Sequence, residues 1–160
     1  MKIEERLVKV LAARSISWCT AESCTGGLIA ARITGVPGAS GCFEGGFVTY
    51  SNRAKTLLLG VPPEIIEKHG AVSSETARAM AQGAREKLNV GIAVAVTGIA
   101  GPAGGSAAKP VGTVFISLAA KGTTSVREFH FEGTRRQIRR RSADEAFILV
   151  LDHLEGRVSG

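Results

Sequence analysis

The chain has 160 residues, of which 44% are hydrophobic, and a formal net charge of +6. This length is typical of one domain with a full core, so residues 1–160 are expected to form a single domain. No apolar run reaches the roughly 18 residues of a membrane span, and the charged start of the chain lacks the apolar centre of a signal peptide. Three cysteines without metal-ligand spacing indicate free thiols, and we expect a cytoplasmic protein.

Hydrophobic periodicity and turn residues divide the chain into helices and strands. The first half is predicted as a helix over 2–14, a strand over 16–21, a helix over 24–34, a Gly-rich loop over 39–46, a strand over 46–51 and short helices over 52–59 and 62–69. The second half is predicted as a helix over 73–88, a strand over 90–97, a loop over 98–109, a hairpin of strands over 111–120 and 125–131, and a helix over 134–155. This order predicts an α/β fold, a three-layer α/β/α sandwich with a mixed, mostly parallel sheet.

Three segments with chemical potential each follow or end a predicted strand. They are Glu22 to Gly27, Thr49 to Lys55, and Thr97 to Gly105. Open α/β sheets bind ligands at the carboxyl ends of their strands, so parallel strands would bring the three segments to one edge. The third segment has neither a G-x-G-x-x-G pattern nor a Walker ending, so it is no nucleotide fingerprint, but its glycines would let the backbone approach a ligand closely.

The first segment places Ser23, Cys24 and Thr25 where a strand gives way to a helix. Backbone N–H groups at a helix N-terminus are unpaired and the helix dipole is positive there, which suits a nucleophile and an oxyanion. The alternative is that Ser23 or Thr25 only caps the helix. Cys24 is the rival nucleophile, because a thiol at a helix N-terminus has a lowered pKa.

A serine nucleophile needs a base, and Lys55 is the candidate because no histidine lies near any of the three segments. A lysine buried beside other cations can lose its proton near neutral pH, and a Ser–Lys pair is a known alternative to Ser–His. Tyr50, the only tyrosine, could relay the proton or orient Lys55. The alternative for Tyr50 is a core aromatic with a satisfied hydroxyl.

The positive charge is concentrated in one cluster of five arginines, namely Arg135, Arg136, Arg139, Arg140 and Arg141. Such a cluster attracts nucleic acid, a membrane or a small phosphorylated substrate. No aromatic residue interleaves with it, and Asp144 and Glu145 follow directly, which makes nucleic acid an improbable ligand. The three histidines are scattered and the only two aspartates, Asp144 and Asp152, both lie in the last predicted helix, so we expect no metal site.

These motifs together resemble the CinA carboxy-terminal domain family. The resemblance covers nearly the whole chain and rests on five segments in order: Thr20 to Gly27, Gly46 to Asn52, Gly70 to Ser73, Gly98 to Pro102 and Lys109 to Val114. Stand-alone members of this family are nicotinamide mononucleotide deamidases of the PncC type. The resemblance therefore implies a stand-alone hydrolase that forms nicotinate mononucleotide and ammonia, without a cofactor or metal, as a homo-oligomer with the same three-layer fold.

The resemblance assigns the nucleophile to Ser23 and the base to Lys55, with Tyr50 nearby. We further expect the substrate to contact Glu22, the N–H groups of Cys24, Thr25 and Gly26, the strand end at Thr97 and Gly98, and, through its phosphate, Arg139 or Arg140. Guanidinium groups suit phosphate oxygens, and backbone N–H groups suit an oxyanion. The alternative function is a non-catalytic nucleic-acid-binding or regulatory module, in line with the competence and DNA-damage name that the family carries.

Overall fold

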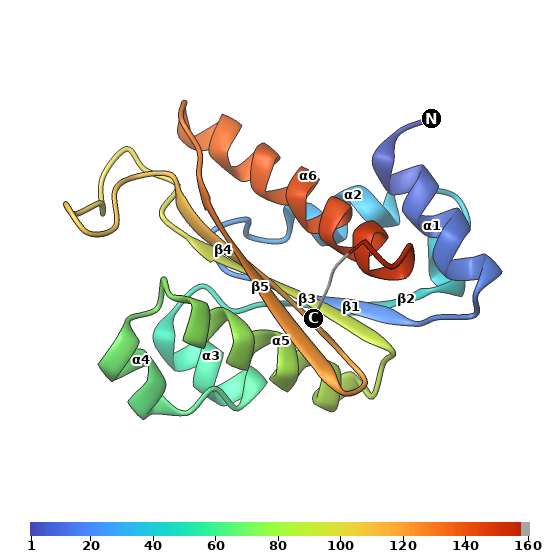
Figure 1. Ribbon diagram of the computed structural model, residues 1–160, viewed down its shortest axis with the longest axis horizontal. Coiled ribbons are helices and arrows are strands. Elements are labelled where there is room, and N and C mark those ends of the chain that lie inside the picture. Colours follow the sequence, from blue (N-terminus) through green and yellow to red (C-terminus); the bar gives the residue numbers. More distant parts are fainter. Residues whose placement is uncertain (158–160) are drawn as a thin grey trace.

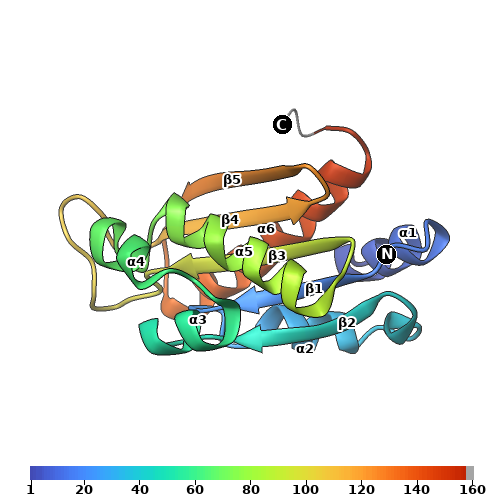
Figure 2. The ribbon, with the colours of Figure 1, turned by 90° about the horizontal axis from the view of Figure 1, so that it is seen from below.

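The computed structural model describes residues 1–157, and within them one sheet has the strand order β2-β1-β3-β4-β5 (Figure 2). The strands are β1 (Trp18–Glu22), β2 (Phe43–Val48), β3 (Ile92–Gly98), β4 (Thr113–Ala120) and β5 (Thr123–His130). Strand β1 runs parallel to both β2 and β3, whereas β4 is antiparallel to β3 and to β5. The expected mixed sheet, with its C-terminal hairpin, is confirmed.

Helices cover both faces of this sheet (Figure 1). One face carries α1 (Ile3–Ala13), α2 (Leu28–Thr34) and α6 (Arg135–Leu154), and the other carries α3 (Asn52–Leu59), α4 (Pro63–His69) and α5 (Ser74–Leu88). A short 3-10 helix, η1 (Ala39–Gly41), precedes β2. The three-layer α/β/α sandwich is therefore confirmed. No helix within residues 1–157 is long and apolar enough to span a membrane.

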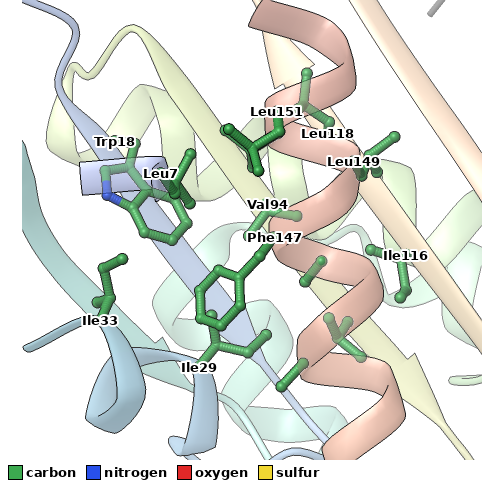
Figure 3. Close-up of a cluster of buried hydrophobic side chains, with 14 of the residues drawn as sticks. Leu7, Trp18, Ile29, Ile33, Val94, Ile116, Leu118, Phe147, Leu149 and Leu151 are labelled. Carbon is green, nitrogen blue, oxygen red and sulfur yellow. The ribbon is translucent and has the colours of Figure 1, made fainter. Parts of the chain in front are cut away.

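The larger hydrophobic core lies between the sheet and α1, α2 and α6 (Figure 3). Phe147 of α6 meets the ring of Trp18 edge-on, with 6.4 Å between the ring centroids, and Ile29 and Ile33 of α2 close the cluster. Side chains alternate along a strand, so the Trp18 face of β1 points to α2 and α6 while Cys19 packs toward α5. Glu22 lies an even number of residues after Trp18, so its side chain is on the same face of β1 and points to α2.

Strand β2 begins at Phe43, inside the segment predicted as a Gly-rich loop over 39–46. The prediction is wrong there because two of the glycines are strand residues that let neighbours approach closely. Gly46 pairs with Thr20 of β1, and a Cβ at Gly46 would lie 2.6 Å from the Oγ1 atom of Thr20. Glycine in a strand often marks this kind of close approach.

The helix predicted to begin at Cys24 begins at Leu28 instead. Gly26 and Gly27 have φ angles of +58° and +95°, in the left-handed region that favours glycine, so the chain makes a turn before the helix starts. Residues 23–27 therefore form an irregular segment, which we name the nucleophile loop. Gly27 is the N-cap of α2 and no side chain of the loop caps it, so the capping alternative for Ser23 and Thr25 is wrong.

The connections out of β1 and β2 determine where a ligand can bind. The chain passes from β1 to β2 through α2 on one face, and from β2 to β3 through α3, α4 and α5 on the other face. Strands β2 and β3 lie on either side of β1. The two connections, one on each face of the sheet, therefore diverge at the carboxyl end of β1. Such a switch point opens a crevice where α/β sheets bind their ligands.

Candidate active site

A cavity of about 180 Å³ lies at the carboxyl ends of the three parallel strands. The segments predicted from sequence supply most of its wall, namely Ser23, Cys24, Tyr50, Asn52, Lys55, Thr97, Gly98 and Ala100. Ala71, Val72 and Arg135 complete the lining and were not singled out from the sequence. The prediction that the three segments meet at one edge of the sheet is confirmed.

Ser23 and Lys55 are in direct contact inside this cavity. The Nζ atom of Lys55 donates hydrogen bonds to Ser23 Oγ and to the main-chain carbonyl of Thr49, each at 2.9 Å. Ser51 caps α3 by accepting from the N–H of Ala54, and this fixes the first turn from which Lys55 extends. Lys55 is only 1% exposed and Ser23 7%, so both groups are shielded from solvent.

Burial lowers the pKa of the Lys55 amine from its ordinary value of 10.5. Both of its hydrogen-bond partners in the described part of the chain are neutral oxygen atoms, and desolvation exceeds the opposing effect of Cys24, which raises the pKa. The equilibrium is thereby shifted toward the neutral amine relative to a lysine in water. A neutral amine carries a lone pair that can accept a proton from the serine hydroxyl.

Glu22 is as buried as Lys55 but lies on the face of β1 that points to α2. Its carboxylate accepts hydrogen bonds from the N–H groups of Gly27, Ile29 and Ala30 at 3.0, 3.1 and 2.9 Å. It therefore does for α2 what an N-cap side chain usually does. Glu22 does not line the cavity, and the N–H groups expected to be unpaired at this helix start are occupied.

Two N–H groups of the nucleophile loop have no acceptor within residues 1–157, those of Cys24 and Thr25. The N–H of Ser23 donates to Val96 O at 2.9 Å, and that of Gly26 donates to Ser23 O at 3.1 Å. Of the three donors expected for an oxyanion, Gly26 is thus already engaged. The arrangement leaves two adjacent donors in the residues that follow Ser23, and of these two residues Cys24 lines the cavity.

Burial raises the pKa of the Cys24 thiol to about 12. The expectation of a lowered pKa is wrong for two reasons: α2 begins only at Leu28, and the effect of desolvation exceeds the opposing effect of Arg139 and Lys55. The thiolate is the nucleophilic form of cysteine. Cys24 lines the cavity, but near neutral pH it does so as an unreactive thiol.

Tyr50 lies at the mouth of the cavity and is 62% exposed, so the core alternative for this residue is wrong. Its hydroxyl accepts a hydrogen bond from Arg135 Nη2 at 3.0 Å, and Arg135 Nη1 donates to Gly101 O at 2.9 Å. Arg135 is the one member of the arginine cluster that lines this cavity. Its place directly after the Thr134 cap, at the first turn of α6, is the signal that could have distinguished it.

The structure does not bring Arg139 or Arg140 to the cavity wall. Arg139 donates from Nε to Cys24 O at 3.2 Å and from Nη2 to Thr25 O at 2.8 Å, so it holds the nucleophile loop from outside. Arg140 is exposed and lines a separate cavity of about 630 Å³ between α1, α2 and α6, which Arg139 also borders. Both phosphate candidates thus lie behind the loop.

The remaining candidates are Thr97, Gly98 and Thr25. Thr97 Oγ1 donates to Ala71 O at 2.8 Å, which ties the segment before α5 to the end of β3. A Cβ at Gly98 would lie 2.7 Å from the side chain of Val114, so glycine permits the close packing of β4 there. Thr25 is fully buried and does not line the cavity. Residues 1–157 contain no group of three or more His, Cys, Asp or Glu side chains that could hold a metal ion.

The fold and the site define an α/β domain with a buried Ser–Lys pair at the switch point of its sheet. The chain belongs to the CinA C-terminal domain family, whose model matches residues 1–154. A CinA-like protein of Geobacter sp. (strain M21) is 54% identical over 138 residues, which are 86% of this chain and 33% of that protein. One of Geotalea daltonii is 63% identical over 119 residues, 74% of this chain and 29% of that protein. The chain thus spans about a third of the length of these curated relatives.

Solved structures of similar length have the same fold. The competence/damage inducible protein CihA from Agrobacterium tumefaciens is 40% identical, has a TM-score of 0.90 and matches over 97% of both chains. A competence-damaged protein (CinA) superfamily protein from Klebsiella pneumoniae 700603 is 30% identical, with a TM-score of 0.93 and 96% of both chains covered. The expected family and fold are confirmed.

Proposed function

We propose that this domain is an amidohydrolase that converts nicotinamide mononucleotide and water to nicotinate mononucleotide and ammonia. The observation that carries the proposal is the 2.9 Å contact between Lys55 Nζ and Ser23 Oγ in a buried cavity. An amine of lowered pKa in contact with a serine hydroxyl is the arrangement that a Ser–Lys hydrolase needs. The substrate follows from the resemblance to the stand-alone members of the CinA family.

In the first half of the reaction, Ser23 Oγ attacks the carboxamide carbon and its proton passes to the neutral Lys55 amine. One N–H of that amine still donates to the carbonyl of Thr49, and the contact with Ser23 reverses, because the hydroxyl now donates to the lone pair of the neutral amine. The resulting oxyanion accepts hydrogen bonds from the free N–H groups of Cys24 and Thr25. When the C–N bond breaks, Lys55 returns the proton to the leaving nitrogen, so ammonia departs and an ester remains on Ser23.

In the second half, a water molecule attacks the ester carbon and Lys55 takes a proton from that water. A second tetrahedral intermediate forms with its oxyanion in the same place. Its collapse breaks the bond to Ser23 Oγ, which regains a proton from Lys55 and releases the carboxylate. The same base thus serves both halves, as in other covalent hydrolases. Tyr50, at the mouth, lies where it can orient the substrate or relay a proton.

Arg135 is the candidate for the 5′-phosphate in place of Arg139 and Arg140. It lines the same cavity as Ser23, and its fork already binds two oxygen atoms at the mouth, those of Tyr50 and Gly101. A guanidinium fork suits the paired oxygens of a phosphate. A cavity of about 180 Å³ would hold the pyridine carboxamide, with the ribose phosphate extending to Arg135 at its opening.

The alternative of a nucleic-acid-binding module has less support. Three arginines of the basic cluster donate to oxygen atoms of the chain itself: Arg135 to Gly101, Arg139 to Cys24 and Thr25, and Arg141 to Glu132. These contacts engage N–H groups that would otherwise be free to donate to the phosphate oxygens of a nucleic acid. That the enzyme is cytoplasmic and homo-oligomeric stays a prediction, and light scattering after size-exclusion chromatography measures the second.

The test is release of ammonia from nicotinamide mononucleotide, compared among the unmodified chain, Ser23→Ala and Cys24→Ala. We expect Ser23→Ala to lose turnover while keeping its fold by circular dichroism, and Cys24→Ala to keep turnover. Turnover in Ser23→Ala together with its loss in Cys24→Ala would assign the nucleophile to the thiol. A DNA-binding assay at two salt concentrations is the parallel arm, because binding to phosphates weakens steeply with salt. A salt-sensitive shift without ammonia release would favour the nucleic-acid alternative.

A further inference from the structure

We propose that Arg139 is a positioning residue, which turns the peptide between Cys24 and Thr25 so that its N–H becomes an oxyanion donor. The inference rests on the proposed acyl transfer at Ser23 and assigns a role to an arginine that does not touch the cavity. Its basis is the contact of the Arg139 guanidinium with two consecutive carbonyls of the nucleophile loop. A cation behind the loop can thereby affect chemistry in front of it.

The direction of each N–H follows from peptide geometry. The C=O and N–H of one trans peptide point in opposite directions, and the peptides of this loop are trans. Arg139 Nε binds Cys24 O, so the N–H of Thr25 points away from the guanidinium. Ser23 O accepts from Gly26, so the N–H of Cys24 points away from Gly26. The direction of each free N–H is thus set by the hydrogen bond that the C=O of the same peptide accepts.

Within the nucleophile loop and the first turn of α2, no other N–H can substitute for these two. The neighbouring donors are already bound within the described chain: Ser23 to Val96 O, Gly26 to Ser23 O, Leu28 to Thr25 O, and Gly27, Ile29 and Ala30 to the Glu22 carboxylate. Among these donors, only those of Cys24 and Thr25 are available to a developing oxyanion at Ser23. Of these, only the Thr25 donor has its direction set by a side chain from another element, Arg139 of α6.

The loop needs such an anchor because its own sequence is permissive. Gly26 and Gly27 occupy left-handed conformations that place little steric limit on rotation of the adjoining peptides. Arg139 packs against this point, with Nη2 at 3.4 Å from where a Gly26 Cβ would be. It is itself half-buried and follows Ile138, which is 1% exposed, so its helix position is fixed by the core. A charged donor also makes a stronger hydrogen bond than a neutral one.

The experiment measures how fast a fluorophosphonate probe modifies Ser23, by mass spectrometry of the intact chain and its peptides. This probe forms a phosphonyl ester with an activated serine and places an oxygen where the oxyanion would sit, so it needs no carboxamide substrate. We expect Arg139→Ala to slow labelling by about tenfold to a hundredfold, less than the roughly hundredfold to thousandfold effect of deleting a donor. The matched control is Arg136→Ala, an exposed arginine in the first turn of the same helix, with an expected rate equal to that of the unmodified chain.

Three readouts separate positioning from a general loss of structure. Guanidinium at millimolar concentration is expected to restore much of the labelling rate of Arg139→Ala and none in Ser23→Ala. With nicotinamide mononucleotide, kcat should fall while KM changes little, because the donor acts on the transition state. The pH at which labelling reaches half its maximum should not move, because Lys55 keeps its surroundings.

The outcomes distinguish this inference from the proposed function. Unchanged labelling in Arg139→Ala, or slower labelling that guanidinium does not restore, overturns the role of Arg139. If Ser23 is labelled but no ammonia is released from the mononucleotide, the proposed substrate is wrong. The role of Arg139 is then decided by the labelling rates of the variants. No labelling of Ser23 in the unmodified chain overturns both, since there would be no activated serine to assist.

Discussion

Glu22 and Lys55 are both 1% exposed, lie on either side of the same loop and bear groups that are charged in water, yet the fold treats them in opposite ways. The region under α2 gives the Glu22 carboxylate three N–H donors at the start of a helix. The region where β1 and β2 end gives the Lys55 amine the hydroxyl of Ser23 and the carbonyl oxygen of Thr49. Burial is the same in the two regions, and the partners differ.

The difference teaches how to distinguish a structural buried ionisable group from a reactive one. A carboxylate that accepts three N–H groups at a helix start supplies acceptors that the helix itself lacks there. A buried lysine amine with only neutral hydrogen-bond partners has its pKa lowered by desolvation, which makes the neutral form more accessible than in water. We therefore expect changes at Glu22 to affect stability and changes at Lys55 to affect activity.

The largest effect is expected for Lys55→Met, which keeps the length and apolar stem of the side chain and removes the base. Turnover should fall by about 10⁴-fold or more, as for other members of a catalytic dyad or triad. The free energy of unfolding should be equal or higher, because a buried amine has been replaced by an apolar group. Lys68→Met, at an exposed lysine, is the control for both measurements. A large loss of stability in Lys55→Met would mean that Lys55 is structural like Glu22.

The next effect is expected for Glu22→Gln, which keeps the shape of the side chain. An amide cannot accept at all the positions that the carboxylate does, so at least one N–H of α2 loses its acceptor. We expect the free energy of unfolding to fall by about 3 kcal/mol in urea denaturation. Glu44→Gln, an exposed carboxylate on β2, serves as the control. Equal stability of the two variants would contradict the role given to Glu22.

A smaller effect concerns the pH dependence of stability. The pKa of Lys55 is lower in the folded than in the unfolded chain, so between the two values the unfolded chain binds a proton that the folded chain does not. The free energy of unfolding should therefore rise with pH through this window, up to about pH 10.5, and Lys55→Met should lack this rise. The raised pKa values of Cys19 and Cys24 lower stability above about pH 9 in both chains, so the two curves are compared below that pH. If the difference in unfolding free energy between the two chains did not change with pH, the pKa of Lys55 would not be lowered in the folded chain.

The smallest effect is expected at Cys24. Its pKa of about 12 predicts that iodoacetamide leaves it unmodified in the folded chain at neutral pH and modifies it after unfolding in urea. Mass spectrometry of the alkylated peptides measures both states. Rapid modification of Cys24 in the folded chain would show that the nucleophile loop opens, and that the shielding ascribed to this region is incomplete.

Local sequence could predict which segments meet at the site. It could not predict which hydrogen-bond partners each buried charged side chain has. Ser23 and Lys55 were predictable because each lies just beyond a recognisable strand, and strand ends meet at one edge of a parallel sheet. The role of Glu22 was not predictable, since it depends on a left-handed turn at Gly26 and Gly27 that brings α2 over the carboxylate. The five arginines of the cluster looked alike in sequence. Arg135 and Arg139 share one face of α6, and the difference of one turn along the helix places Arg135 at the cavity and Arg139 behind the loop.

The same limits explain the errors in element boundaries. A run of glycines before residue 47 resembles a loop, but pairing with β1 makes Gly45 and Gly46 part of β2. The start of α2 was set too early because Ser23 and Thr25 are good caps by type, whereas a carboxylate from the preceding strand takes that role. In both cases a contact between elements outweighed a local preference.

The turn of the antiparallel hairpin β4–β5 is a suitable place to attach a label. Strand β4 starts beside the site, where Gly98 pairs with Val114, and ends at the opposite end of the sheet, where Ile92 pairs with Ala120. The turn that follows, Lys121 and Gly122, is therefore as remote from the reaction centre as the sheet allows, and a Cβ built on Gly122 meets nothing within 4 Å. A dye or an immobilising tether attached at Lys121 should leave catalysis undisturbed, and single-molecule or surface-bound assays could use this position.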